Sequence, residues 1–142
     1  IHTAQRMVVA SGMFEDENVI RILNGAKVKI HKGYLENVEE VYQMADAYLF
    51  PTRSAEFVIS IPLSVMEALS CGVPVIGYKS FENLNELTGS EGAITLIDNA
   101  EQLDEVLPEV IEKKSDHSLL EKTGSWCEVA QSVLRMVREE NA

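Results

Sequence analysis

The sequence predicts an α/β fold with a doubly wound parallel sheet. Short apolar runs typical of strands alternate with stretches whose apolar residues recur at helical spacing, and Gly, Pro and Asn mark the turns between them. In such an order, right-handed crossovers place the strands in a parallel sheet with helices on both faces. A length of 142 residues fits one domain with a real core.

Three strands are predicted in the first half of the chain, at residues 7–10, 28–30 and 47–50. Two helices are predicted between them from one-sided apolar spacing. The first carries its apolar residues over 19–23, with an acid-rich start at 15–17 and an end at Asn24-Gly25. The second begins where Asn37 and Glu40 have the spacing of a capping box.

The second half of the chain continues the alternation. Pro62 suits the first position of a helix and Gly72 the position just after its end, so a short, largely apolar and buried helix is expected from Pro62 to Cys71. Strands are expected at 73–77 and 93–97.

The last third of the chain is predicted to be helical. Asn99 and Gln102 open a helix that runs to Ile111 and that Pro108 bends or interrupts. After a polar break at 113–116, a further helix is expected from Ser125, with its apolar residues between Trp126 and Val137 at helical spacing.

The most informative residue is Glu67, the single ionised group between Phe57 and Tyr78. An unpaired carboxylate in apolar surroundings is costly, so it must reach a partner, water or a ligand. The run is not predicted to span a membrane, because Glu67, two prolines and a glycine divide it into pieces of about half the required length. A purely structural role stays open, in which Glu67 pairs with a lysine or caps a neighbouring backbone group.

Ligands of parallel α/β sheets bind beyond the carboxyl ends of the strands, where the loops 11–15, 33–37 and 51–61 are expected. The last of these loops leads into the helix that begins at Pro62, and the free N–H groups of a helix start attract phosphate. Glu67 lies about one and a half turns further on, where its carboxylate can accept hydrogen bonds from hydroxyl groups. A phosphate site beside an acceptor for vicinal hydroxyls indicates a nucleotide.

The composition excludes several classes of partner and site. Twelve basic against 23 acidic residues give a net charge of −11, which opposes attraction to nucleic acid or to anionic lipid. Two cysteines, Cys71 and Cys127, indicate neither a disulfide framework nor a zinc site and fit a reducing cytoplasm. None of the three histidines is predicted to act in catalysis. The sequence has no initiating methionine and is expected to be a piece of a longer protein.

Two segments resemble the C-terminal, donor-binding domain of GT-B glycosyltransferases, especially glycosyltransferase family 4. They read ADAYLFPT (residues 45–52) and PLSVMEALSCGVPVI (residues 62–76). Family members show an Ala-Asp pair before a strand that ends in Pro-Ser or Pro-Thr, and then the pattern EAmAcGvPVv. The resemblance extends from about Met7 to Val137 and implies a Rossmann-like sheet that forms one half of a GT-B fold.

The resemblance assigns site residues one position at a time. Glu67 matches the glutamate that binds the ribose hydroxyls of the sugar nucleotide. The backbone N–H groups of Leu63 and Ser64 match those that hold the diphosphate, and the turn Gly33-Tyr34-Leu35 matches the edge of the nucleobase pocket. Pro62 stands where many members have a glycine; because proline has no N–H and stiffens the turn, the sugar contacts are expected to differ.

The catalytic position departs from the family pattern. Relatives usually have another glutamate near the donor sugar, eight positions before the one that matches Glu67. Ile59 occupies that position here. Glu56, three residues earlier, is the candidate replacement. The Arg and Lys that neutralise the diphosphate in relatives are expected upstream of Ile1, as are the first strand and helix of the domain and the whole N-terminal acceptor domain.

The resemblance implies a hexosyltransferase that moves a sugar, with retention and without a metal ion, from a nucleotide sugar to a glycan, lipid or small molecule. The nucleotide sugar is a substrate, and no cofactor is expected. Residues 1–142 would form a single donor-binding domain, inactive by itself. A cytoplasmic location is expected, and the resemblance leaves room for peripheral association of the full-length protein with the cytoplasmic face of a membrane.

Two other classes stay open. The first is a noncatalytic, degenerate nucleotide-binding or partner-binding module, for which Ile59 would mark the lost chemistry. The second is a receiver-like or flavin-binding domain of similar topology, which has less support because no acidic cluster follows the first strand. A hydrolase triad is not indicated, because no serine lies in a nucleophile-elbow pattern.

Overall fold

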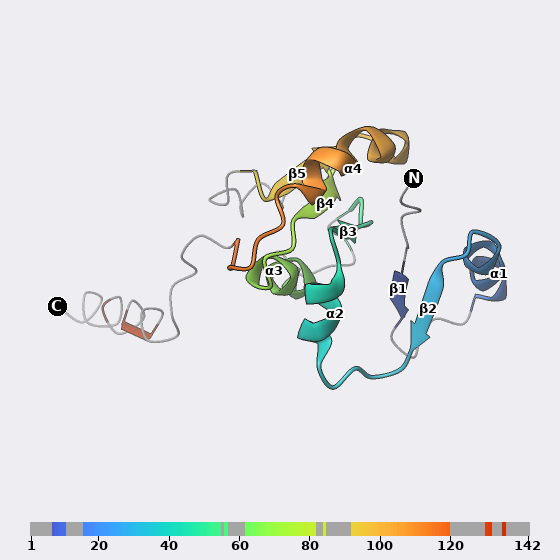
Figure 1. Cartoon of the computed structure of the whole chain (residues 1–142), viewed down its shortest axis with the longest axis horizontal. Coiled ribbons are helices and arrows are strands. Elements are labelled where there is room, and N and C mark those ends of the chain that lie inside the picture. The colour runs from blue at the N-terminus through green and yellow to red at the C-terminus, as the bar shows by residue number, and fades with distance from the viewer. Residues whose placement is uncertain are drawn as a thin grey trace. The chain divides into compact units, whose positions relative to one another are not determined.

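The computed structural model of the chain describes residues 7–10, 16–54, 56, 62–81, 84, 92–119, 130, 131 and 135. Strands and helices alternate as predicted (Figure 1). Their order is β1 (Met7–Ala10), α1 (Glu17–Gly25), β2 (Lys29–Lys32), α2 (Val38–Met44), β3 (Tyr48–Phe50), α3 (Leu63–Ser70), β4 (Val75–Tyr78), β5 (Ile94–Ile97), a 3-10 turn η3 (Ala100–Gln102) and α4 (Leu103–Ile111). The chain divides into two compact units, Ile1–Val38 and Glu39–Ala142.

The first unit contains a parallel pair of strands, in which β1 lies beside β2 with Met7 opposite Lys29 and Ala10 opposite Lys32. Between them, α1 begins at Asp16, whose side chain accepts hydrogen bonds from the N–H groups of Asn18 (2.9 Å) and Val19 (3.2 Å). The helix start predicted from the acid-rich stretch at 15–17 is confirmed, and Asp16 is its capping residue.

The second unit contains a three-stranded parallel sheet in the order β3-β4-β5. The central strand β4 is buried along its whole length, and its side chains alternate between two core clusters. Val75 packs with residues of α3, and Ile76 packs with Val110 of α4. Helices therefore cover both faces of this sheet, with α3 on one side and α4 on the other (Figure 1). These features confirm the predicted α/β class with a Rossmann-like parallel sheet.

The ends of α3 differ slightly from the prediction. Pro62 caps the helix instead of occupying its first turn, and its carbonyl accepts from the N–H groups of Val65 (3.0 Å) and Met66 (3.3 Å). Gly72 lies just after the helix with φ of +74°, a conformation that favours glycine. Only one face of α3 is buried, formed by Val65, Ala68 and Leu69.

The helical segment near residue 100 begins at Asn99, as predicted, but its capping bonds differ from those of a regular capping box by one residue each. Asn99 caps η3 by accepting from the N–H of Glu101 at 3.0 Å, and Gln102 accepts from the N–H of Asp98 at 2.7 Å. Pro108 lies inside α4, which continues through it to Ile111. Of the helix expected from Ser125, the described residues 130, 131 and 135 are helical, and the rest lies outside the described residues. In the described part of the chain, no helix is long and apolar enough to cross a bilayer.

Candidate functional site

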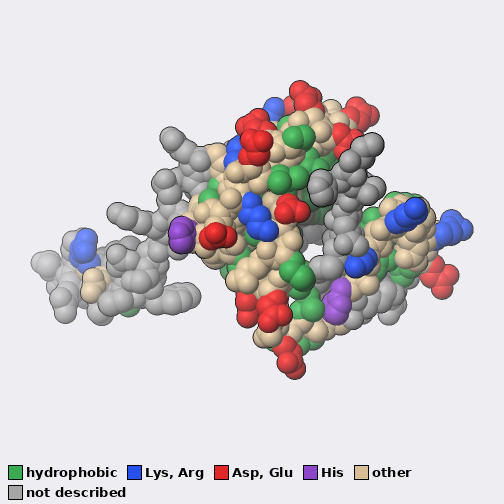
Figure 2. Space-filling view, viewed as in Figure 1, with side chains coloured by type: hydrophobic (Ala, Val, Ile, Leu, Met, Phe, Trp, Pro, Cys, Tyr) green, Lys and Arg blue, Asp and Glu red, His purple; other side chains and the backbone are tan. Residues whose placement is uncertain are grey.

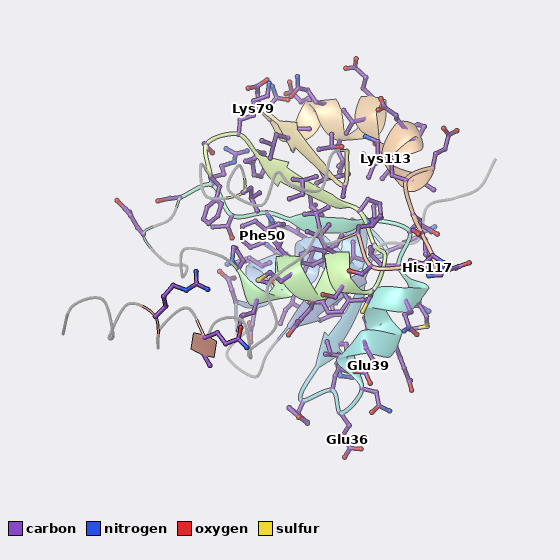
Figure 3. The ribbon with its side chains drawn as sticks, turned by 90° about the vertical axis from the view of Figure 1, so that its left-hand side faces the viewer. Glu36, Glu39, Phe50, Lys79, Lys113 and His117 are labelled. Carbon is purple, nitrogen blue, oxygen red and sulfur yellow. The ribbon has the colours of Figure 1, made fainter. Side chains whose placement is uncertain are left out.

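The carboxyl ends of β3, β4 and β5 form the edge at which parallel sheets bind ligands. In Figure 3, Phe50 and Lys79 mark this edge, while Lys113 and His117 lie toward the opposite, amino edge. The chain leaves β3 through Pro51–Ser54 and re-enters the unit at Pro62, so α3 begins at the carboxyl edge and runs back across the sheet.

The start of α3 offers backbone N–H groups. Those of Leu63 and Ser64, in the first turn, have no acceptor within the helix, and no side chain of the capping residue Pro62 bonds to them. Pro62 is buried, whereas Leu63 is 62% exposed. The two residues predicted to hold the diphosphate, Leu63 and Ser64, thus lie with Pro62 at one helix start, where the helix dipole favours an anion.

Glu67 lies on the exposed side of α3. The hydroxyl of Tyr42, on α2, donates a hydrogen bond to Glu67 Oε2 at 3.1 Å. The carboxylate is therefore not sealed in the interior, and no lysine among the described residues pairs with it. Its surroundings leave it open to a ligand from solvent.

Tyr42 is in edge-to-face contact with a second tyrosine, Tyr48. Its ring meets that of Tyr48 edge to face, with 5.7 Å between centroids and 81° between planes. Burial raises the pKa of Tyr42, and neighbouring Tyr48 and Glu67 raise it further. Burial also raises the pKa of Tyr48, and a side-chain hydrogen bond with Ser64 partly lowers it again. Each tyrosine thus contacts one predicted donor-binding residue of α3.

These pKa shifts predict a pH dependence of stability. Because folding raises the pKa of Tyr42 above its ordinary 10.0, the folded state holds the phenolic proton more tightly than the unfolded chain. This contribution is fully present below pH 10.0 and is lost as the pH rises above that value. We expect the urea midpoint to fall less steeply above about pH 10 in Tyr42→Phe than in the wild type.

Tyr34→Phe provides the control for this measurement. Tyr34 is 89% exposed, so its replacement should leave the alkaline slope unchanged. Equal slopes for the wild type and Tyr42→Phe would show that the folded state does not retain the Tyr42 proton.

Two cations lie at the carboxyl edge of the sheet. The Arg53 guanidinium stands over the Tyr78 ring, 4.5 Å from its centroid, and Lys79 forms an ion pair with Asp98 at 2.7 Å. Arg53 was not among the predicted site residues. Its position in the loop that leads into α3 is the sequence feature that could have indicated it. On the face that Figure 2 shows, acidic side chains gather over α4.

The remaining predicted site residues are described only in part. Glu56 is exposed, and its N–H donates to Ser54 Oγ at 3.2 Å. Ile59 lies outside the described residues. The turn Gly33-Tyr34-Leu35 belongs to the first unit. Gly33 has φ of +116°, and Leu35 is half-buried.

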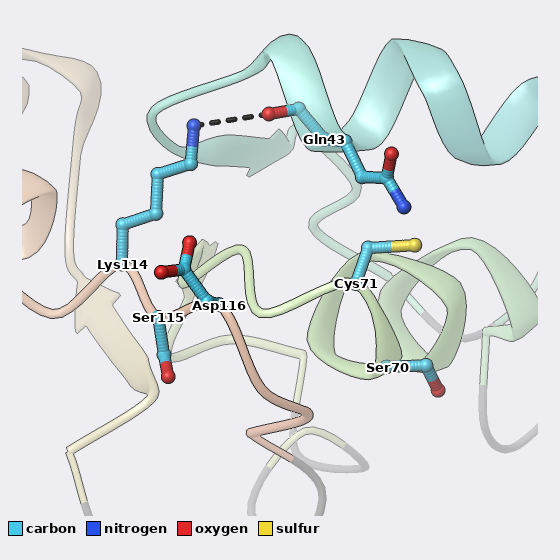
Figure 4. A pocket seen from close by; sticks show the side chains of 6 residues that line it. All are labelled: Gln43, Ser70, Cys71, Lys114, Ser115 and Asp116. Atoms are coloured by element: carbon cyan, nitrogen blue, oxygen red, sulfur yellow. Dashed lines mark hydrogen bonds between the residues drawn. The ribbon is translucent and has the colours of Figure 1, made fainter.

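A pocket of about 280 Å³ lies at the amino edge of the three-stranded sheet (Figure 4). Lys114 crosses it, donating to the carbonyl of Gln43 at 3.0 Å and lying 3.8 Å from Asp46. Cys71 beside it has a free thiol whose pKa is raised by burial and by nearby Glu39 and Glu67. The other lining residues are Ser70, Ser115 and Asp116. Among the described residues, no group of His, Cys, Asp and Glu is arranged to hold a metal ion.

Comparisons with known proteins identify a family. A family model described as "Glycosyl transferases group 1" matches residues 2–113. The searches of curated proteins and of solved structures found no match. The matched region includes both sheets, α3 and Glu67.

Proposed function

The chain belongs to the glycosyl transferases group 1, as a glycosyltransferase family 4 domain of the C-terminal GT-B half. From this premise we propose that it binds the donor substrate of a retaining glycosyltransferase. The reaction moves a hexosyl group from a nucleotide sugar to a glycan, lipid or small-molecule acceptor. An acceptor-binding domain supplies the other wall of the cleft. The low cysteine content favours a cytoplasmic location.

The observation that carries this proposal is the position of Glu67 on α3. An exposed carboxylate, hydrogen-bonded by a phenol, stands one turn beyond a helix start that faces the ligand-binding edge of a parallel sheet. A nucleoside diphosphate combines the two features that such a site recognises: a diphosphate for the helix start, and ribose hydroxyls for the carboxylate.

Each site residue has a role in this proposal. The N–H groups of Leu63 and Ser64 hold the diphosphate, and Glu67 accepts from the ribose hydroxyls. The turn that begins at Gly33 borders the nucleobase. Charge develops on the departing diphosphate in the transition state, so N–H groups fixed on a packed helix stabilise it without reorganisation. This mechanism does not require a metal ion.

Binding tests the proposal directly. Isothermal titration of the full 142-residue chain with nucleoside diphosphates carrying uracil, guanine or adenine should show weak binding of at least one. The matching nucleotide sugars should not be turned over by these 142 residues alone, because the proposal assigns acceptor binding to another domain. If none of the nucleotides binds, the donor-binding assignment is wrong.

A noncatalytic nucleotide-binding module is the second candidate, favoured by Ile59 at the place of the usual glutamate. The two candidates differ in the role of Glu56. In an active enzyme that uses Glu56 beside the sugar, Glu56→Gln lowers turnover by the full-length protein and leaves nucleotide affinity unchanged. Turnover that is unaffected by Glu56→Gln would remove Glu56 from the reaction, and the absence of any turnover would favour the module.

A further inference from the structure

One hydrogen bond links α2 to α3 across the surface of the second unit. Tyr42 and Glu67 are 25 residues apart in sequence, and the Tyr42 hydroxyl reaches Glu67 Oε2 at 3.1 Å. Tyr42 is half-buried and packs against the core cluster that contains Val65, Ala68 and Leu69 of α3. The donor of this bond is therefore anchored, and the exposed acceptor is the group that it restrains.

The second tyrosine fixes the direction of the first. The edge-to-face contact with Tyr48 limits rotation of the Tyr42 ring, and Tyr48 itself packs against the same core cluster. A phenol is protonated at neutral pH, and burial raises the pKa of Tyr42 further, so its hydroxyl acts as a hydrogen-bond donor toward the carboxylate.

We propose that Tyr42 is a positioning residue, which holds the Glu67 carboxylate in the orientation that receives the ribose hydroxyls of the donor. An exposed glutamate otherwise samples several rotamers, and ordering it on binding weakens affinity. Oε2 uses one lone pair to accept the hydrogen bond from Tyr42. Its other lone pair and those of Oε1 can accept hydrogen bonds from the ligand. This inference rests on the proposed nucleotide-binding function.

The test compares Tyr42→Phe, Glu67→Gln and the double variant by isothermal titration of the full chain. The ligand is the nucleoside diphosphate that binds the wild type best. We expect Tyr42→Phe to weaken its binding by about tenfold, and the double variant to bind no more weakly than Glu67→Gln alone. Unchanged affinity in Tyr42→Phe, or additive losses in the double variant, would overturn the positioning role.

A second ligand separates positioning from a general structural effect. The 2′,3′-dideoxy form of the same nucleotide lacks the hydroxyls that Glu67 would bind, so Tyr42→Phe should leave its affinity unchanged. An equal loss for both ligands would show that Tyr42 only supports the fold. If the wild type binds no nucleoside diphosphate, the proposed function fails; if it binds and only Glu67→Gln weakens binding, only the positioning role fails.

Discussion

Glu67→Ala is expected to weaken the binding of the preferred nucleoside diphosphate by more than about 100-fold. Without the carboxylate, the complex loses charge-assisted hydrogen bonds from two ribose hydroxyls, each of which contributes about 1.5–3 kcal/mol. The fold should survive, because Glu67 is exposed and its replacement leaves the buried face of α3 intact. Titration calorimetry measures the affinity, and circular dichroism checks the helix content.

Glu109→Ala is the matched control for this prediction. Glu109 is also an exposed glutamate on a helix that covers the same sheet, and it forms an ion pair with Lys113 at 3.1 Å. It lies on α4, on the opposite face from Glu67. Because Glu109 is on the other face of the sheet, its removal should leave nucleotide affinity unchanged. The fold should also survive, since a surface ion pair contributes at most about 1 kcal/mol to stability. Equal losses in the two variants would exclude a specific role for Glu67.

Gly72→Ala is expected to destabilise the chain by about 3–5 kcal/mol, from backbone strain and overpacking together. Gly72 has φ of +74°, which an L-residue with a side chain rarely adopts. A Cβ at this position would also collide with the carbonyl oxygen of Ser115 and approach that of His117. Backbone atoms cannot rotate away as side chains do, so the segment that crosses the end of α3 must move.

The same segment is hydrogen-bonded to the helix end, which adds to the cost. Ser115 N–H donates to Gly72 O at 3.0 Å, and Leu119 N–H donates to Leu69 O at 2.8 Å. Urea unfolding measures the loss. Gly25→Ala is the control, because Gly25 ends α1 with no atom within 4 Å of an added Cβ, and its replacement should change stability by less than about 1 kcal/mol. Similar midpoints for both variants would contradict the packing argument.

The local elements were predictable because their signals lie in short stretches of sequence. The acid-rich stretch at 15–17 marks the start of α1 and Asn99 marks the start of η3, as predicted, and Gly72 lies just after the end of α3. The boundary at Pro62 was wrong by one position, because proline fits both the cap and the first turn of a helix. The predicted burial of α3 holds for one face only, since the run of apolar residues does not show which of them meets the sheet.

The site was predictable to the extent that a family motif or a helix start marks it. Glu67, Leu63 and Ser64 were selected on those grounds, and their roles stay predictions. Tyr42 was not selected as a site residue, although its hydroxyl reaches Glu67. No spacing rule connects two positions in different helices.

The sequence by itself determined the order of strands and helices, the α/β class and the position of Glu67 on a helix that follows a predicted ligand-binding loop. Only the tertiary structure decided that Tyr42 bonds to this carboxylate, that Arg53 lies over Tyr78, and that residues 115–119 cross the end of α3. The physical reason is the range of the interactions. Periodicity and capping act within a few residues of one segment, whereas contacts between segments depend on how helices pack against a common sheet.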